Sequence, residues 1–212
     1  MKTVLITGAG GGIGKQTALY FAKNNWTVIA TLLHPSEGED FKDISTIFCY
    51  EMDVTSTESI ASATKIILDN HPKIDTIINN AGMGYRSFVE LSEDAKIDTI
   101  VNVNWLGVVK VCRAFIPTFR QQKFGQFINI TSVAGLVNLP LGNFYHSTKQ
   151  AVESFSECMA YELLDFNISV STVQFGNAPT SFQSNVTKCK ATKIDSYNRL
   201  MDKVTAILHK KT

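Results

Sequence analysis

The chain has 212 residues, of which 44% are hydrophobic and 18% charged, and this composition fits one ordinary globular domain with its own core. Its formal net charge of +1 gives no electrostatic reason to expect a nucleic acid or an acidic membrane as a partner. No run of about 18 apolar residues is present, so we expect no membrane-spanning helix and no membrane partner.

The first expected element is a short buried strand at residues 3–7, which runs directly into a glycine-rich turn. The apolar run is too short for a secretory leader, so we expect a cytoplasmic protein. Five glycines lie between Gly8 and Gly14, just before a helix expected at residues 15–24. Glycines let a backbone turn tightly beside a ligand, and the start of the helix offers free N–H groups to a pyrophosphate.

The glycine turn matches neither of two common nucleotide motifs in full. Counted from Gly8, the Gly-x-Gly-x-x-Gly pattern ends on Ile13, and no Gly-Lys-Ser/Thr ending follows, so a P-loop nucleotidase is not indicated. The position at the first strand–helix junction still follows the dinucleotide-binding rule. A glycine-rich turn without any ligand is the alternative.

Short β-branched strands and longer helical patterns alternate along the rest of the chain. Further strands are expected at residues 27–31, 47–51, 74–79, 126–130 and 168–174, and further helices at 59–70, 94–122, 143–165 and 194–210. Pro117 is expected to bend or interrupt the helix at 94–122. Continuous apolar strands joined by helices indicate a parallel sheet with helices on both faces.

We therefore predict one α/β domain over residues 1–212, a Rossmann-type doubly wound parallel sheet of six strands in the order 3-2-1-4-5-6. A ligand crevice is expected at the carboxyl ends of the strands. The polar stretch at about 180–196 is expected to be a substrate loop, able to act as a mobile lid. Four scattered cysteines lack Cys-x-x-Cys spacing, so we expect reduced thiols and no metal site.

Tyr145 and Lys149 lie four residues apart, and Ser132 lies thirteen residues before Tyr145. In a helix this spacing puts the phenol and the ammonium on one face. A phenol has a pKa of about 10, and a nearby positive charge lowers it, so the pair could exchange a proton with a substrate oxygen. Such pairs also occur by chance on helix surfaces. His146 points elsewhere and is expected to be exposed or packed.

These motifs together resemble the short-chain dehydrogenase/reductase family. The resemblance covers the chain to about residue 180, and it is carried by Thr7, Gly8, Gly12 and Gly14, by Asn79-Asn80-Ala81-Gly82, by Asp53, Asn104, Ser132, Tyr145 and Lys149, and by Phe175-Gly176 with Thr180. It implies that Tyr145 is the general acid/base, that Lys149 lowers its pKa, and that Ser132 holds the substrate oxygen. Asn104 would hold a water that links Lys149 to solvent, while a nicotinamide carries the hydride.

The resemblance also implies a set of cofactor-binding residues: Gly8, Gly12, Ile13, Gly14, Leu32, Asp53, Val54, Asn80, Ala81, Gly82, Tyr145, Lys149, Gly176 and Thr180. Other roles stay open for some site residues. Asp53 could instead form a turn before Thr55, and Asn79 could be a bridge between strands. Ser132 could be a simple cap and Asn104 a buried polar residue that satisfies nearby backbone.

The sequence departs from the family pattern where the second strand ends. An acidic residue there selects NAD(H) and an arginine accommodates the phosphate of NADP(H), but Leu32 and Leu33 do neither. The lack of a carboxylate leans toward NADP(H) over NAD(H), with partial positive charge available from His34 or Lys15. Phe175 also replaces the family's proline, so packing must hold that turn.

The chain is short for the family, and no clear seventh strand follows the sixth. The edge of the sixth strand would then be exposed, unless the last helix covers it. A complete substrate pocket and the usual tetramer are both in question, while a homodimer through the helices at 94–122 and 143–165 remains plausible.

The sequence thus predicts an NAD(P)-dependent oxidoreductase that interconverts a small or medium alcohol and a carbonyl. The alternative is a dinucleotide-binding regulatory or scaffold protein without turnover; a methyltransferase would need neither Tyr145 nor Lys149. Substrate contacts are expected after Gly82, at residues 136–144 and in the polar stretch. Apolar residues at 136, 139, 141 and 144 suggest either an apolar lining or ordinary packing.

Overall fold

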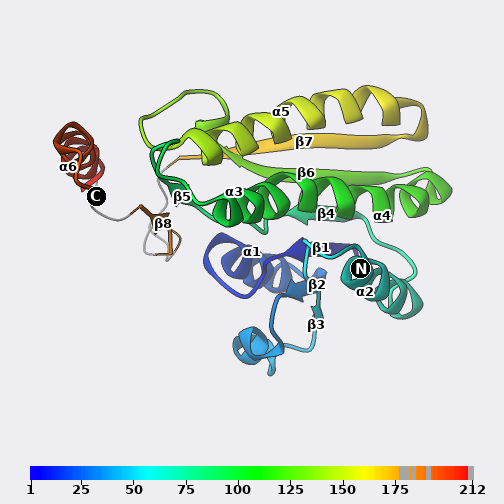
Figure 1. Ribbon diagram of the computed structural model, residues 1–212. Coiled ribbons are helices and arrows are strands. Elements are labelled where there is room, and N and C mark those ends of the chain that lie inside the picture. Colours follow the sequence, from blue (N-terminus) through cyan, green and yellow to red (C-terminus); the bar gives the residue numbers. More distant parts are fainter. Residues whose placement is uncertain (177–181, 183–184, 190–191, 210–212) are drawn as a thin grey trace.

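The computed structural model describes residues 1–176, 182, 185–189 and 192–209 (Figure 1). Six parallel strands form the main sheet, in the order β3-β2-β1-β4-β6-β7. Their bounds are β1 Thr3–Thr7, β2 Thr27–Leu32, β3 Ile47–Glu51, β4 Thr76–Asn79, β6 Gly125–Ser132 and β7 Ile168–Phe175. The predicted doubly wound sheet and its strand order are confirmed. No seventh strand joins this sheet within the described residues.

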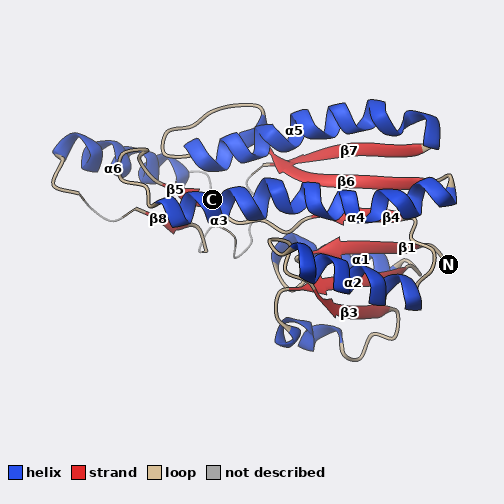
Figure 2. Cartoon of the chain, turned by 45° about the vertical axis from the view of Figure 1, so that its right-hand side comes forward, coloured by secondary structure: helices blue, strands red, loops and turns tan. Residues whose placement is uncertain are grey.

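The helices lie on both faces of the sheet, with α1 behind it and α2 and α4 in front (Figure 2). Their bounds are α1 Gly12–Lys23, α2 Thr57–Asn70, α3 Asp94–Val101, α4 Gly107–Gln122, α5 Asn143–Leu163 and α6 Asp195–His209. Four short helical elements also lie within the described residues: η1 Pro35–Phe41, η2 Asn102–Leu106, η3 Val133–Gly135 and η4 Leu164–Phe166, with η2 π-helical and the other three 3-10.

The larger core lies on the face that α2, α4 and α5 cover. Phe115 and Phe119 of α4 and Phe127 of β6 are fully buried there, because α4 presents one apolar face to the sheet. The opposite face is covered less completely. α1 and η1 pack on β1, β2 and β3, but Ile128 and Ile130 of β6 are only half buried. An apolar hollow of about 580 Å³ remains on this side, lined by α1 residues and Phe175.

The helix predicted at 94–122 is continuous but irregular. Its interruption is the π-helical turn η2, while α4 runs through Pro117, so the predicted position of the break is wrong. By length and composition alone, this stretch is apolar enough to cross a bilayer. Val111, Cys112 and Phe115 are buried against the sheet, as in the core helix of a globular domain.

The described part of the polar stretch holds a strand that the sequence did not predict. β8 (Thr187–Lys188) pairs in parallel with β5 (Tyr85–Arg86), beyond the loop end of the main sheet. Next to it, Tyr197 of α6 stacks on Phe88, with the ring centroids 4.0 Å apart. The expectation that the last helix could cover the edge of the sixth strand is therefore wrong, since α6 contacts the segment at Phe88 and lies away from β7 (Figure 1).

Candidate active site

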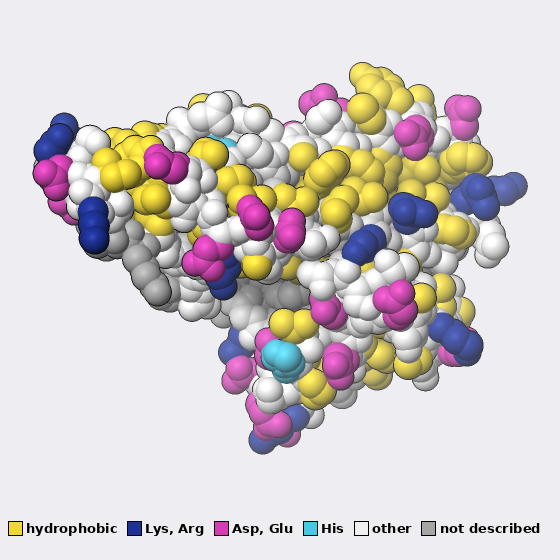
Figure 3. All heavy atoms as spheres, in the orientation of Figure 1, with side chains coloured by type: hydrophobic (Ala, Val, Ile, Leu, Met, Phe, Trp, Pro, Cys, Tyr) yellow, Lys and Arg dark blue, Asp and Glu magenta, His cyan; other side chains and the backbone are white. Residues whose placement is uncertain are grey.

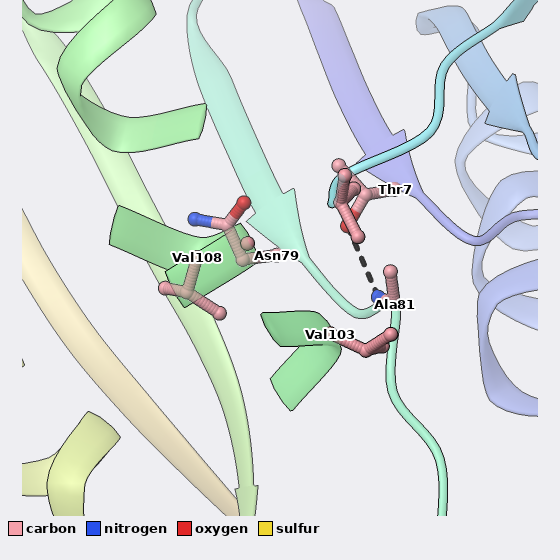
Figure 4. Close-up of a pocket in the computed structure, with 7 residues that line it drawn as sticks. Thr7, Asn79, Ala81, Val103 and Val108 are labelled. Carbon is pink, nitrogen blue, oxygen red and sulfur yellow. Dashed lines mark hydrogen bonds between the residues drawn. The ribbon is translucent and has the colours of Figure 1, made fainter. Parts of the chain in front are cut away.

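The carboxyl ends of β1 and β4 are tied together through Thr7. Its hydroxyl oxygen accepts hydrogen bonds from the N–H groups of Asn80 and Ala81, both at 3.0 Å. Figure 4 shows the bond from Ala81. The Asn80 amide in turn donates to the carbonyls of Thr7 and Gly8, at 2.9 and 3.1 Å. Asn80 was predicted to bind the cofactor, and its side chain holds the glycine turn in place.

The glycine turn needs its glycines at defined points. Gly8 and Gly12 have φ of +63° and +52°, in the left-handed region that glycine tolerates best. A Cβ added at Gly14 would lie 2.4 Å from both the Asn80 amide nitrogen and the Gly8 carbonyl oxygen, so no side chain fits there. A Cβ at Gly11 would meet nothing within 4 Å, so the space above the turn is open.

The start of α1 fits a pyrophosphate group. Gly11 is its N-cap, no side chain caps the first turn, and that turn contains no acidic residue. The first N–H groups of the helix therefore face open space with the positive end of the helix dipole behind them. These observations fit a bound dinucleotide at the predicted residues Gly8, Gly12, Ile13 and Gly14.

A narrow recess lies beneath the turn at Asn79 and Ala81, and it leaves no room for a water molecule (Figure 4). Val54, Val103 and Val108 are among its lining residues. This is a packing defect and not a ligand site. The Val54 side chain, predicted to contact the cofactor, is almost fully buried in the core instead, so only its backbone is available to a ligand.

Asn79 forms a bridge between strands, which was the alternative role predicted for it from the sequence. Its amide donates to Asn129 Oδ1 at 2.8 Å, and the Asn129 amide donates to Ser156 Oγ at 2.8 Å. The chain of hydrogen bonds links β4, β6 and α5 inside the core. It fixes the distance between the strand that carries the Asn80 turn and the helix that carries Tyr145.

Asn104 is fully buried in the π-helical turn η2. Its Oδ1 accepts from the Met83 N–H at 2.8 Å, and its amide donates to the Met83 carbonyl at 2.9 Å. A Cβ added at Gly82 would lie 3.4 Å from Asn104 Oδ1 and 3.7 Å from Lys149 Nζ. Asn104 thus positions the segment at Gly82–Met83 beside Lys149, while its role in a water relay stays a prediction.

Ser132 ends β6 and caps the short turn η3. Its Oγ accepts from the Ala134 N–H at 3.2 Å and donates to the Phe175 carbonyl at 3.3 Å. The same hydroxyl forms a hydrogen bond with Tyr145. Ser132 is therefore both the cap that one interpretation predicted and a direct neighbour of the predicted acid. The contact with Phe175 also shows how the residue at the family's proline position is held.

Tyr145 and Lys149 share a face of α5, as their spacing predicted. Lys149 Nζ lies 5.9 Å from the centroid of the Tyr145 ring and donates to the Ile130 carbonyl at 2.8 Å. Lys149 is almost completely buried, whereas Tyr145 is partly exposed. His146, between them, is packed: its Nδ1 donates to the Val137 carbonyl at 2.7 Å and ties down the loop before α5.

The electrostatics at Tyr145 differ from the sequence prediction. Burial raises the pKa of Tyr145, and the groups that lower this pKa are the Ser132 hydroxyl and the Arg86 guanidinium. Lys149 is not among them, so the expected control of the phenol by this ammonium is not observed. Burial also lowers the pKa of Lys149 to about 8, although the Glu153 carboxylate acts in the opposite direction.

The remaining predicted cofactor residues occupy different environments. Asp53 Oδ1 accepts from the Thr55 N–H and hydroxyl at 2.8 and 2.7 Å, so it forms the turn that was its alternative role. The Leu32 side chain is buried in the core, which leaves only its backbone for a ligand. A Cβ at Gly176 would meet nothing within 4 Å. Thr180 lies outside the described residues.

Sequence reasoning missed two charged residues near the site. Glu37 of η1 reaches the glycine turn, and Glu153, one helical turn beyond Lys149, accepts from Gln174 and Thr131. Arg86 lies in the segment after Gly82 that was expected to contact substrate, and it also faces Tyr145. The i, i+4 spacing could have found Glu153, whereas no pattern pointed to Glu37. Among the described residues, no cluster of three His, Cys, Asp or Glu side chains could hold a metal ion.

The glycine turn at the switch point of a parallel sheet, with Ser132, Tyr145 and Lys149 close by, defines a Rossmann-type dinucleotide-binding domain. Residues 2–191 match the sequence profile of the short chain dehydrogenase family, and the chain belongs to this family.

Two curated relatives illustrate the family. The chain is 37% identical over 184 residues to a 3-ketodihydrosphingosine reductase of Bacteroides thetaiotaomicron, covering 87% of this chain and 66% of the relative. It is 32% identical over 196 residues to human retinol dehydrogenase 8, covering 87% of this chain and 61% of that protein. The chain thus spans about two thirds of the length of these relatives or less.

Solved structures give the same picture of the fold. A 3-ketoacyl-(acyl-carrier-protein) reductase from Brucella melitensis, complexed with NADH, superposes with a TM-score of 0.84 at 28% identity, covering 87% of this chain and 79% of that one. ElxO with NADP bound superposes with a TM-score of 0.81 at 29% identity, covering 86% and 77%. The two structures carry different forms of the nicotinamide cofactor.

Proposed function

We propose that this protein is an NAD(P)-dependent oxidoreductase that interconverts an alcohol and a carbonyl, with Tyr145 as general acid/base. The observation that carries the proposal is the grouping of Ser132, Tyr145 and Lys149 beside the glycine turn. The turn is linked to Lys149 through Ala81, which bonds to Thr7, and through Gly82, where an added Cβ would lie 3.7 Å from Nζ.

Reduction of a carbonyl adds a hydride to carbon and a proton to oxygen. A bound nicotinamide would supply the hydride, and in oxidation it would accept one. The raised pKa of Tyr145 keeps its phenol protonated at neutral pH, so it can donate the proton to the carbonyl oxygen. The Ser132 hydroxyl, hydrogen-bonded to the phenol, would hold that oxygen in line.

Lys149 would hydrogen-bond the ribose next to the nicotinamide and replace the proton that Tyr145 gives up. Its pKa of about 8 suits this second task, because a buried ammonium with a lowered pKa gives up a proton near neutral pH. Asn104 would complete the relay through a water molecule, while its side chain fixes the backbone at Met83.

An apolar substrate suits the surroundings of Ser132 and Tyr145. Val133, Leu136, Val137 and Leu139 follow Ser132 in the chain, and each is between 46% and 64% exposed. Exposed apolar side chains gathered in one loop are a common sign of a binding site. The relatives named for 3-ketodihydrosphingosine and for retinol support a lipophilic alcohol or carbonyl compound as the substrate.

The cofactor is proposed to be a nicotinamide dinucleotide. The sequence-based lean toward NADP(H) rested on the absence of a carboxylate near the end of β2. That premise is wrong, because Glu37 Oε2 accepts a hydrogen bond from the Leu33 N–H at 3.1 Å.

The proposal is tested with Tyr145→Phe, which removes only the hydroxyl. We expect turnover of a lipophilic ketone to fall by about 10²–10⁴-fold, the usual contribution of a general acid, while the dissociation constant for the reduced cofactor stays the same. Nicotinamide absorbance measures the first quantity and cofactor fluorescence the second. Unchanged turnover in the variant would refute the role of Tyr145. Tight cofactor binding without turnover of any ketone or alcohol by the unmodified protein would favour a non-catalytic regulatory protein.

A homodimer through α4 and α5 and a cytoplasmic location are also proposed. Hydrophobic side chains gather over the region of these helices in Figure 3, and Tyr161 and Leu164, at the end of α5 and just beyond it, are 83% and 72% exposed. Sedimentation at increasing protein concentration would test the dimer, with Tyr161→Asp expected to weaken it.

The four free thiols, at Cys49, Cys112, Cys158 and Cys189, support a reducing compartment.

A further inference from the structure

The short helix η1 places a carboxylate against the glycine turn. A Cβ added at Gly10 would lie 2.6 Å from the Cβ of Glu37 and 2.7 Å from its Oε2. Glu37 Oε2 also accepts from the Leu33 N–H at 3.1 Å, just beyond the end of β2. The Glu37 side chain therefore spans the gap between β2 and the turn, which is where the adenosine ribose of a dinucleotide lies in this class of fold.

Positive charge near this carboxylate is already engaged. Lys15 of α1 forms an ion pair with Asp40, and Lys42 pairs with Glu39 at 3.5 Å. Residues 33–42 contain three carboxylates, at Glu37, Glu39 and Asp40, and a single lysine. Figure 1 draws the segment that includes η1 in the lower part of the molecule. In the same part of Figure 3, acidic side chains gather together with some basic ones.

We infer that Glu37 selects NAD(H) over NADP(H), an inference that rests on the proposed function. The free ribose hydroxyls of NAD(H) can donate hydrogen bonds to the carboxylate. A phosphate on the 2′ oxygen would bring about −1.5 to −2 charge against it and has no hydrogen to donate. Leu33, half exposed beside Glu37, offers no compensating charge.

The residue that selects the cofactor thus lies in the turn after the strand and not at the strand end itself. Its carboxylate arrives because η1 folds back on the glycine turn. Two packing contacts hold η1 there: Phe41 is buried in the smaller core, and a Cβ at Gly38 would lie 3.0 Å from Leu32 Cδ1 and 3.1 Å from Cys49 Sγ.

The test is to titrate the full chain with NADH and with NADPH and to follow cofactor fluorescence. We expect NADH to bind about tenfold more tightly or better, the effect of one charge-assisted hydrogen bond. Glu37→Gln keeps the size of the side chain and an oxygen for the Leu33 N–H, and it should bring the two dissociation constants to within a few-fold of each other. Adding Leu33→Arg to this variant should reverse the preference.

Glu39→Gln is the matched control, since it removes the same charge from an exposed carboxylate of the same helix that pairs with Lys42. It should leave the ratio of the two dissociation constants unchanged. An equal change of that ratio in Glu39→Gln, or NADPH bound as tightly as NADH by the unmodified protein, overturns the inference and leaves the proposed function standing. Failure to bind either cofactor overturns both.

Discussion

The two ends of the proposed cofactor site, catalytic and adenosine, differ in secondary structure, burial and charge. At the catalytic end, Tyr145 and Lys149 project from the regular helix α5, and Lys149 is a strongly buried ammonium whose pKa burial lowers to about 8. At the adenosine end, Glu37 and its acidic neighbours belong to the short helix η1, and Glu39 and Asp40 are exposed to solvent.

This difference determines how each end responds to change. Charges in a dry site interact strongly, so removing one group from the catalytic end should have a large effect that salt hardly alters. Charges at the solvent-facing end are screened, so selection of the cofactor should weaken as the salt concentration rises. The catalytic end is therefore the more sensitive to a single substitution.

Among these substitutions, Lys149→Met at the catalytic end should have the largest effect. It should lower turnover and raise the free energy of unfolding. Turnover is expected to fall by about 10²-fold or more, because the proton supply of Tyr145 is lost. The free energy of unfolding at pH 7 is expected to rise by roughly 1–3 kcal/mol, because a buried ammonium whose pKa falls from 10.5 to about 8 destabilises the folded state. Kinetic assays and urea unfolding measure the two quantities.

A loss of stability in Lys149→Met would show that the hydrogen bond to the Ile130 carbonyl outweighs the cost of burying the charge. Full turnover in the same variant would remove Lys149 from the proposed mechanism.

Gly14→Ala and Gly11→Ala test the turn that joins the two ends. The added methyl group at Gly14 would lie 2.4 Å from the Asn80 amide and the Gly8 carbonyl, whereas the one at Gly11 meets nothing within 4 Å. We expect Gly14→Ala to destabilise the fold by about 1–3 kcal/mol and to abolish tight cofactor binding. Gly11→Ala should change stability by less than about 0.5 kcal/mol. Thermal unfolding and cofactor titration compare the pair, and equal effects would contradict this account of the turn.

The regular part of the molecule could be predicted from the sequence because its signals are local. The spacing of Tyr145 and Lys149 defines one face of a helix, and the apolar strands define the parallel sheet. Even the bridging role of Asn79 could be anticipated, because a polar residue at the end of a buried strand needs a partner.

The parts that could not be predicted depend on contacts between distant segments or on backbone irregularities. Glu37 reaches Gly10 only because η1 folds back, and Arg86 meets Tyr145 only because a two-residue strand turns toward α5. The π-helical turn around Asn104 has no strong sequence signal, whereas Pro117 gave one that the tertiary structure overrides. The pKa of Tyr145 was misjudged because helical spacing says nothing about burial.

The pH dependence gives the finest test of the catalytic end. Because the pKa of Tyr145 is raised above its ordinary value, its phenol stays protonated well past neutrality, and the first loss of reduction rate should follow the Lys149 pKa of about 8. Oxidation needs the phenolate, so its rate should rise with pH by up to about tenfold per unit below the Tyr145 pKa.

Stability should respond to the same ammonium with a definite sign. The folded-state pKa of Lys149, about 8, lies below the ordinary value of 10.5, so between these values the unfolded chain binds more protons than the folded one. The contribution of Lys149 to the free energy of unfolding therefore rises with pH across this window, as the folded protein sheds the buried charge. Other groups titrate in the same range, so the measurement is the difference between the unmodified protein and Lys149→Met. That difference should shrink from pH 8 to pH 10. A constant difference would mean that burial does not lower the pKa of Lys149 in the folded protein.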